Sequence, residues 1–178
     1  MYLAVAVLCV LLTSINLVLV FGVIRRLRVH TSQLEQLIKA GPRPEPMIGV
    51  GKRPAPFAVS PLNGAPMTEV DLAAGAIVAF FSTTCKSCEE WLPKFVEAAA
   101  STRAQRLVIV AADNPAEPKV AAMVETLRPV ATVAVEPEKG PVATAFQVTG
   151  FPAMCRLDAA GRVETYTPTE VLAVAVPA

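Results

Sequence analysis

The part of the chain that most restricts its fold is a pair of cysteines, Cys85 and Cys88, that follows closely on a short apolar run. Residues Ile77 to Phe81 have the apolar and aromatic composition of a buried strand, and a helical pattern begins at Cys85. Two thiols at this spacing on the first turn of a helix can close a small disulfide. A strand followed by a thiol pair at a helix start favours redox chemistry over a structural role.

Within this pair, Cys85 is the expected nucleophile. It stands at the helix start, where the partial positive charge of the helix N-terminus stabilises a thiolate, and Lys86 adds a positive charge beside it. As a thiolate, Cys85 would attack a partner disulfide and form a mixed disulfide, which Cys88 then resolves. The same steps run backwards oxidise a partner dithiol, so relative potentials determine the direction. The expected partners are therefore protein dithiols and disulfides.

Two other roles for the cysteine pair are less favoured. A structural zinc site needs four ligands, but the chain offers only Cys9, Cys155 and His30 besides the pair, and there is no second CxxC. A passive structural disulfide is an alternative in an oxidising compartment, but the closed loop is too small to constrain the unfolded chain much. We expect a redox site with neither a bound metal nor a cofactor.

The N-terminal segment carries no charged residue from Tyr2 to Ile24. At 1.5 Å per residue, a helix of this length reaches roughly 34 Å, enough to cross the hydrocarbon core of a bilayer. A cleaved signal peptide is less favoured, because the segment is long, lacks a basic start and has no small-x-small cleavage site. We therefore expect residues 1–24 to form a transmembrane anchor, so that one partner is the membrane.

Residues 25–49 are expected to form a juxtamembrane helix and a Pro-rich tether. Their first part is amphipathic, whereas the second is rich in Pro and Gly, a composition that suits a semi-rigid tether. The remainder, residues 50–178, has the usual size of one domain. A formal net charge of +1 over 178 residues provides no basic footprint, so we expect no nucleic-acid partner.

Strands and helices alternate along this domain. The expected strands are residues 57–60, 67–70, 77–81, 107–111, 130–135, 153–157 and 163–166. The expected helices are residues 85–100, 119–127, 142–146 and 170–176. This order predicts an α/β fold in which helices flank a mixed sheet, preceded by a small N-terminal hairpin around Asn63 and Gly64.

Residues 50–178 resemble thioredoxin-fold proteins, and more narrowly the membrane-anchored TlpA-like group and MauD, the methylamine dehydrogenase accessory protein. The CxxC after a strand, Pro93 in the following helix and the sequence Gly150-Phe151-Pro152 match motifs of that fold in the same order. The resemblance implies that Pro93 kinks the helix. It also implies that Pro152 is cis and packs beside the disulfide, which makes it a catalytic residue together with the two cysteines.

The chain departs from the family pattern near the thiols. The departures are Thr84 in place of Trp, Lys86 and Ser87 in place of the usual dipeptide, and Ala79 in place of a buried acid. The proton acceptor for Cys88 is therefore expected to be Glu89, Glu90 or water, and water is favoured because the two glutamates should be exposed. The bulky Phe151 before the proline is expected to narrow the groove in which a partner strand pairs, and so to affect partner choice.

The resemblance implies a membrane-tethered thiol-disulfide oxidoreductase. It would act in the maturation of an extracytoplasmic redox enzyme, such as methylamine dehydrogenase or a c-type cytochrome, and would exchange electrons with a membrane partner that the sequence does not identify. One alternative is a non-catalytic binding or chaperone module. A peroxidase is a further alternative, because Ser82 precedes Cys85 by three residues as in peroxidatic sites, but Val78 stands where such sites have proline.

Two features of the sequence give opposite indications of the side of the membrane on which the domain lies. Arg25, Arg26 and Arg28 follow the expected anchor, and the positive-inside rule would place the domain in the cytoplasm. The resemblance implies the extracytoplasmic side, where disulfides persist. We expect the extracytoplasmic side, because the charge rule is a bias whereas the resemblance spans a whole domain.

Overall fold

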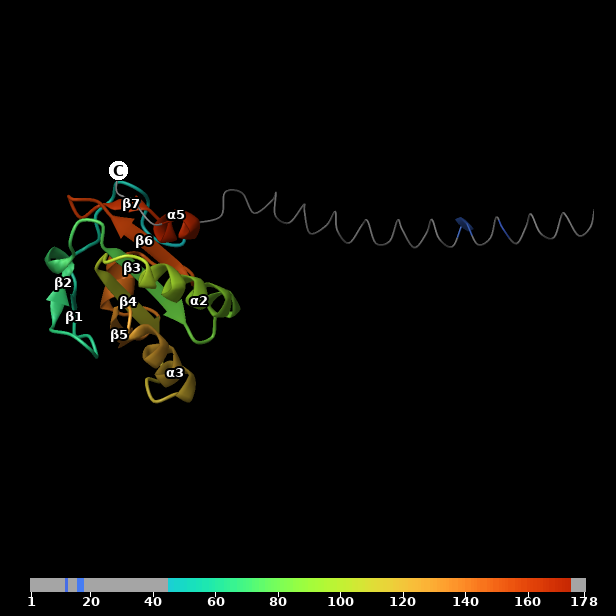
Figure 1. Ribbon diagram of the computed structural model, residues 1–178, viewed down its shortest axis with the longest axis horizontal. Helices are drawn as coiled ribbons and strands as arrows, with labels where there is room; N and C mark the ends of the chain where they lie inside the picture. Colours follow the sequence, from blue (N-terminus) through green and yellow to red (C-terminus); the bar gives the residue numbers. More distant parts are fainter. Residues whose placement is uncertain (1–11, 13–15, 18–44, 174–178) are drawn as a thin grey trace, which may run out of the picture. The chain divides into compact units, whose positions relative to one another are not determined.

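The computed structural model describes residues 12, 16–17 and 45–173 (Figure 1). The predicted anchor at residues 1–24 and the predicted helix and tether up to residue 44 lie outside these residues, apart from positions 12, 16 and 17. Within the described part, no helix combines the length and the apolar character that crossing a bilayer requires.

The folded unit begins at Glu45, earlier than the predicted domain start at residue 50. Met47 and Ile48 are buried, and the Ile48 N–H donates to the carbonyl of Phe146 at 2.9 Å. Residues 45–49, predicted as the end of the tether, therefore belong to the domain. Their place depends on apolar contacts with a distant part of the chain, which the local Pro- and Gly-rich composition did not reveal.

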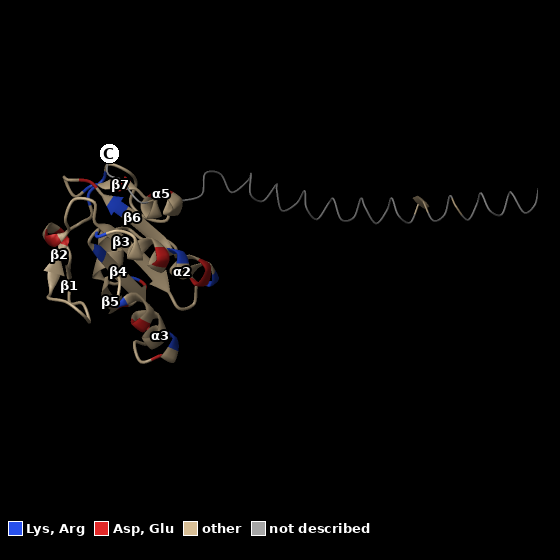
Figure 2. Ribbon diagram, viewed as in Figure 1, with Lys and Arg blue, Asp and Glu red and all other residues tan. Residues whose placement is uncertain are grey.

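The centre of the domain is a five-stranded sheet in the order β5-β4-β3-β6-β7 (Figure 1). The strands are β3 Ile77–Ser82, β4 Arg106–Ala111, β5 Thr132–Glu136, β6 Ala153–Leu157 and β7 Val163–Thr165. β3, β4 and β5 are parallel, whereas β6 runs antiparallel to β3 and to β7, so the predicted mixed sheet is confirmed. The central strand β3 carries no charged residue and is buried throughout (Figure 2).

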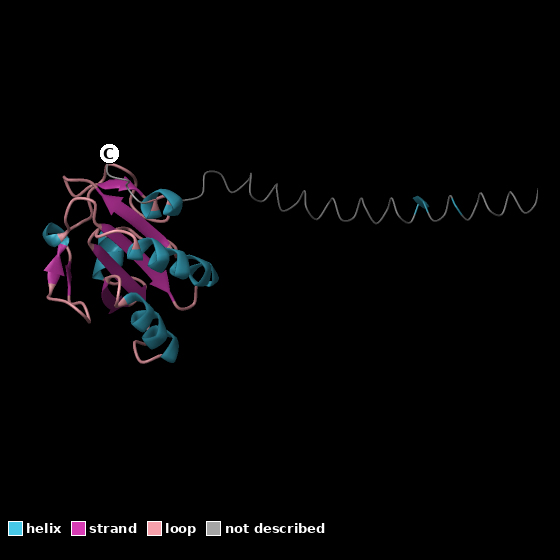
Figure 3. Cartoon of the chain, viewed as in Figure 1, coloured by secondary structure: helices cyan, strands magenta, loops and turns pink. Residues whose placement is uncertain are grey.

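Helices lie on both faces of this sheet (Figure 3). They are α2 Lys86–Ala100, α3 Pro118–Leu127, α4 Pro141–Ala145 and α5 Pro168–Leu172. Because successive side chains of a strand point to opposite faces, Phe80 packs with Phe146 after α4, whereas Phe81 packs with Phe95 of α2. Two cores therefore enclose β3, which explains why its sequence is apolar without alternation.

The N-terminal hairpin is shorter than predicted. β1 Ala58–Val59 and β2 Met67–Thr68 pair antiparallel, and a short 3₁₀ helix, η1 Glu69–Asp71, replaces the end of the predicted strand at 67–70. The Asp71 carboxylate accepts the N–H of Thr68 at 2.7 Å and its hydroxyl at 2.8 Å. These side-chain hydrogen bonds stabilise the turn in place of further strand pairing.

Residues before and within the hairpin cover both edges of the main sheet. At the β5 edge, the N–H of Leu62 donates to the carbonyl of Val133, and the Val133 N–H donates to Asn63 Oδ1, each at 2.7 Å. At the β7 edge, the N–H of Gly51 donates to the carbonyl of Val163 at 2.8 Å. Open hydrogen-bonding groups of Val133 and Val163 on the two edge strands are thereby satisfied within the chain.

The other element boundaries differ slightly from the predicted ones. β5 begins at Thr132 rather than at residue 130, because the N–H groups of Val130 and Ala131 both donate to the Leu127 carbonyl and close the end of α3. α5 begins at Pro168, where a helix needs no N–H donor, rather than at residue 170. Residues 174–176 of the predicted last helix lie outside the described residues.

Candidate active site

Cys85 and Cys88 lie at the carboxyl end of β3, where the chain turns into α2. Cys85 is the N-cap residue of α2, with an extended backbone (φ −94°, ψ 111°), so the helix begins at Lys86, one residue later than predicted. The N–H of Cys88 donates to the carbonyl of Cys85 at 3.1 Å. Both residues are free thiols; Cys85 is half-buried, whereas Cys88 is 0% exposed.

The loop before β6 forms the other side of the site. The thiol of Cys85 donates to the carbonyl oxygen of Phe151 at 3.1 Å, although 66 residues separate them. The peptide bond between Phe151 and Pro152 is cis, as the resemblance implied. This loop is held beside the thiols because Ala153, the first residue of β6, pairs with Phe80 of β3.

The two thiols of the pair have different environments. Burial and the neighbouring Cys85 thiol raise the pKa of Cys88 from 9.0 to about 12, and a hydrogen bond from the Ser82 N–H opposes this rise. That N–H lies 3.5 Å from Cys88 Sγ. A buried thiol is held in its neutral form because the low-dielectric interior disfavours the thiolate. The inner thiol is therefore neutral near neutral pH.

Two of the predicted supporting residues, Lys86 and Pro93, lie on α2. Lys86 is exposed on the first turn of α2, and Pro93 lies inside the same helix on an exposed position. Basic and acidic residues are mixed along α2 (Figure 2). One of the basic residues, Lys94, has its Nζ 4.6 Å from the ring centre of the partly buried Trp91. Lys86 and Pro93 are thus part of the helix that carries the thiols, and their supporting roles stay predictions.

Cys155 lies apart from the thiol pair. It is fully buried in β6, opposite Val78 of β3, and it packs in the core that contains Phe80 and α4. Cys88 packs in the core on the other face of the sheet. Burial raises the pKa of Cys155 from 9.0 to about 12, opposed by a backbone hydrogen bond from Val78. In these contacts Cys155 acts as a small buried hydrophobic residue of the core.

Sequence reasoning missed the part that Ser82 plays at the site. It singled Ser82 out only for its spacing from Cys85, as a feature of peroxidatic sites. The structure shows that Ser82 accepts a hydrogen bond from Cys85, donates one to Cys88 and shares one with Thr84. The available signal was a lone polar residue at the end of an apolar strand. Such a residue must find hydrogen-bond partners when it is buried.

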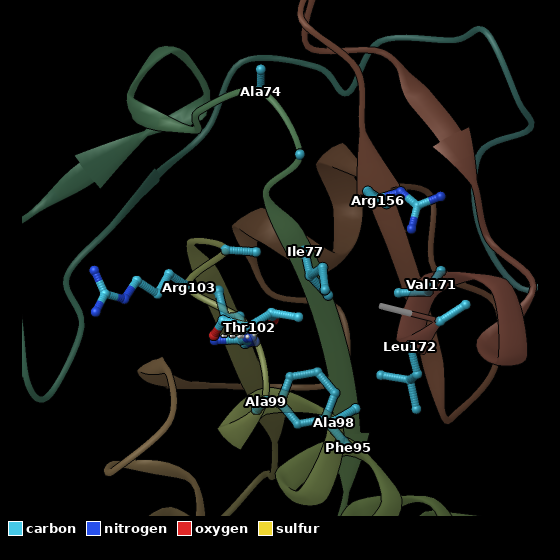
Figure 4. Close-up of a pocket in the computed structure, with 14 residues that line it drawn as sticks. Ala74, Ile77, Phe95, Ala98, Ala99, Thr102, Arg103, Arg156, Val171 and Leu172 are labelled. Atoms are coloured by element: carbon cyan, nitrogen blue, oxygen red, sulfur yellow. Dashed lines mark hydrogen bonds between the residues drawn. The ribbon is translucent and has the colours of Figure 1, made fainter. Parts of the chain in front are cut away.

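A separate cavity of about 310 Å³ lies at the other end of β3 (Figure 4). Ile77, the first residue of β3, lines it together with the carboxyl-terminal half of α2 and with α5. Figure 4 shows Phe95, Ala99 and Leu172 around this space. None of the predicted catalytic or supporting residues lines the cavity, which is therefore distinct from the thiol site.

Comparison with known proteins bears on the fold. No protein-family model matches the sequence, and no curated protein matches it. A solved thio-disulfide isomerase from Thermus thermophilus is similar, with a TM-score of 0.56, 21% identity, and coverage of 67% of this chain and 86% of that chain. The thioredoxin domain of a thiol-disulfide oxidoreductase from Bacteroides vulgatus has a TM-score of 0.54 and 13% identity, covering 67% and 88%. The domain has a thioredoxin fold.

A third solved structure with this thioredoxin fold is a secreted disulfide oxidoreductase from Mycobacterium tuberculosis. Its TM-score is 0.53 at 19% identity, and the match covers 63% of this chain and 82% of that chain. The predicted fold class is therefore confirmed for the described residues. Identities of this size establish the fold alone, so the narrower likeness to TlpA-like and MauD-like proteins stays a prediction.

Proposed function

We propose that this protein is a thiol-disulfide oxidoreductase in which Cys85 and Cys88 exchange a dithiol or a disulfide with partner proteins. The observation that carries the proposal is the unequal exposure of two thiols within one helical turn. Cys85 is half-buried at the N-cap of α2, whereas Cys88 is fully buried. A partner can reach the outer thiol, and the inner thiol is placed to displace the partner. The thioredoxin fold supports this assignment.

The exchange proceeds in two steps. In the reductive direction, the Cys85 thiolate attacks one sulfur of the partner disulfide, and the other partner sulfur leaves as a thiolate. Cys88 then loses its proton and attacks Cys85 Sγ, which breaks the bond to the partner. Two electrons pass to the partner, and the Cys85–Cys88 disulfide forms. Because burial raises the pKa of Cys88 to about 12, Cys85 is the sulfur that starts the exchange.

The Phe151–Pro152 loop is proposed to bind the partner. Pro152 lacks an N–H, so it leaves backbone groups of the loop free to pair with an extended partner segment. The carbonyl of Phe151 lies 3.1 Å from Cys85 Sγ, so a partner that approaches this sulfur also meets the loop. The half-buried Phe151 side chain would limit the room beside Cys85 and so select among partners.

We also propose that residues 1–24 anchor the protein in a membrane and that the domain faces the extracytoplasmic side. The support is the uncharged segment from Tyr2 to Ile24 and the resemblance to TlpA-like and MauD-like proteins. In this setting the partner would be an extracytoplasmic redox enzyme under maturation, such as methylamine dehydrogenase or a c-type cytochrome. Arg25, Arg26 and Arg28 argue for the other orientation, so the placement needs a direct test.

The activity is tested by reduction of insulin disulfides with the purified full-length protein and dithiothreitol as the electron source. We expect the native protein and Cys155→Ala to accelerate precipitation of the insulin B chain, because Cys155 packs on the other face of the sheet. Cys85→Ala should not accelerate it. A native protein without reductase activity that still prevents aggregation of an unfolded client would instead be a binding or chaperone module.

The placement is tested by labelling intact cells with a membrane-impermeant maleimide after mild reduction. An extracytoplasmic domain exposes Cys85 to the reagent, so labelling of the native protein and its loss in Cys85→Ala are expected. Labelling that appears only after lysis would place the domain in the cytoplasm.

A further inference from the structure

Ser82, the last residue of β3, is hydrogen-bonded to both cysteines of the pair. Its N–H donates to Cys88 Sγ at 3.5 Å, and its carbonyl accepts the N–H of Cys85 at 3.3 Å. Its hydroxyl accepts the N–H of Thr84 at 3.3 Å and shares a hydrogen bond with the Thr84 hydroxyl at 2.9 Å. A single residue therefore connects the end of the strand, the loop and both thiol-bearing residues.

The Ser82 hydroxyl is the only side-chain polar group in β3. The residues before it, Ile77 to Phe81, are apolar and buried, and Ser82 itself is 2% exposed. A buried hydroxyl costs free energy unless it is hydrogen-bonded, and here its bonds go to Thr84, which is exposed. The pair of hydroxyls thus holds the loop from Ser82 to Thr84 in one conformation. It also fixes the backbone that carries the Ser82 N–H.

The buried thiol of Cys88 has few polar neighbours. Desolvation and the Cys85 thiol disfavour its thiolate, whereas the Ser82 N–H stabilises the thiolate. Lys86, Glu89 and Glu90, the charged residues on the same turn of α2, are exposed. In the described part of the chain, the Ser82 N–H is therefore the donor placed to stabilise negative charge on Cys88.

We propose that Ser82, held by its hydrogen bond to Thr84, is a positioning residue for the second step of the exchange. In that step, Cys88 gives its proton to water, and its thiolate attacks Cys85 Sγ in the mixed disulfide. The Cys85–partner bond breaks, the Cys85–Cys88 bond forms, and the partner sulfur leaves with the electron pair and takes a proton from water. The inference rests on the proposed function, within which it assigns this role.

The two steps are separated with dithiobis(nitrobenzoate), an aromatic disulfide, and the reduced full-length protein carrying Cys9→Ser. Attack by Cys85 releases a first thionitrobenzoate, and attack by Cys88 releases a second, so stopped-flow absorbance resolves two phases. We expect Ser82→Ala to slow the second phase roughly threefold to tenfold, as the loss of one hydrogen bond implies. The pH midpoint of that phase should move upward, while the first phase stays unchanged.

Two further variants keep the test decisive. Ser82→Thr retains the hydroxyl and should restore the native second phase. Thr84→Val removes the exposed hydroxyl that pairs with Ser82, keeps the backbone N–H and leaves the strand unchanged, so it should slow the second phase even where Ser82→Ala does not fold. Second phases equal to the native one in Ser82→Ala and Thr84→Val, or an equal slowing of both phases without a pH shift, would overturn the role of Ser82. A native protein that releases only one thionitrobenzoate would contradict the proposed function itself.

Discussion

The thiol of Cys85 donates a hydrogen bond of 3.1 Å to the carbonyl oxygen of Phe151. The contact exists because Phe80 of β3 pairs with Ala153 of β6, which brings the loop before β6 to the start of α2. A thiolate has no proton to donate, so this hydrogen bond is lost when Cys85 ionises. Under the proposed function, the Phe151 carbonyl would then be a free acceptor beside Cys85 Sγ, where it can accept an N–H of the partner backbone.

Removing the inner thiol should trap partners. In Cys88→Ala, Cys85 still attacks a partner disulfide, but no thiol is left to resolve the mixed disulfide, so covalent complexes accumulate. Non-reducing gels of extracts from cells that express the variant should show bands of higher mass that disappear on reduction. Cys85→Ala is the matched control and should trap little. Equal trapping by both variants, or by neither, would contradict the assigned order of attack.

The inner thiol should also react slowly with alkylating reagents. The rise of the Cys88 pKa from 9.0 to about 12 lowers its thiolate fraction near neutral pH by roughly a thousandfold. Peptide mapping of the reduced protein after iodoacetamide treatment should show Cys85 modified first at neutral pH. Modification of Cys88 should increase as the pH rises toward 12. In urea-unfolded protein the difference between the two cysteines should vanish, and modification of Cys88 first in the folded protein would reverse the roles.

The buried Cys155 should make stability fall at high pH. Its pKa is raised from 9.0 to about 12 in the folded state, so between these values an unfolded chain releases a proton that the folded chain keeps. The stabilisation is therefore complete below pH 9 and is lost as the pH rises through 12. Urea unfolding over this range should give a shallower decline for Cys155→Ala than for the native protein. Parallel curves would show that Cys155 does not titrate in this way.

Asn63 should stabilise the join between the hairpin and the main sheet. Its amide donates to the carbonyl of Ala131 at 2.9 Å and accepts the N–H of Val133 at 2.7 Å. Asn63→Ala removes both hydrogen bonds and should lower the free energy of unfolding by about 0.5–1.5 kcal/mol, because water can reach the exposed side of the site. Asn63→Asp keeps the acceptor and should cost less. Thr126→Ala, which removes a hydroxyl bond within α3, is the control, and a loss no larger than in this control would contradict the prediction.

Local patterns predicted the elements well where a short stretch of sequence carries the signal. The apolar run at Ile77 to Phe81 predicted β3, and the order of strands and helices predicted the mixed sheet. The wrong boundaries of the hairpin and of the domain start depend on side-chain hydrogen bonds or on distant contacts, whereas those of β5 and α5 depend on local backbone hydrogen bonds and on a proline. Asp71 turns the chain after Thr68, and Met47 reaches a core formed by residues far along the chain.

The sequence by itself determined the order of the elements, the position of the thiol pair at a helix start, and the proline that follows Phe151, because each of these is a property of adjacent residues. The tertiary structure decided that Cys85 is only half-buried whereas Cys88 is fully buried, and it placed the Phe151 carbonyl against Cys85. It also showed that Ser82, which the sequence marked only by its spacing from Cys85, is hydrogen-bonded to both cysteines. These features depend on strand pairing and packing between segments distant in sequence, and such pairing is specified by the whole fold.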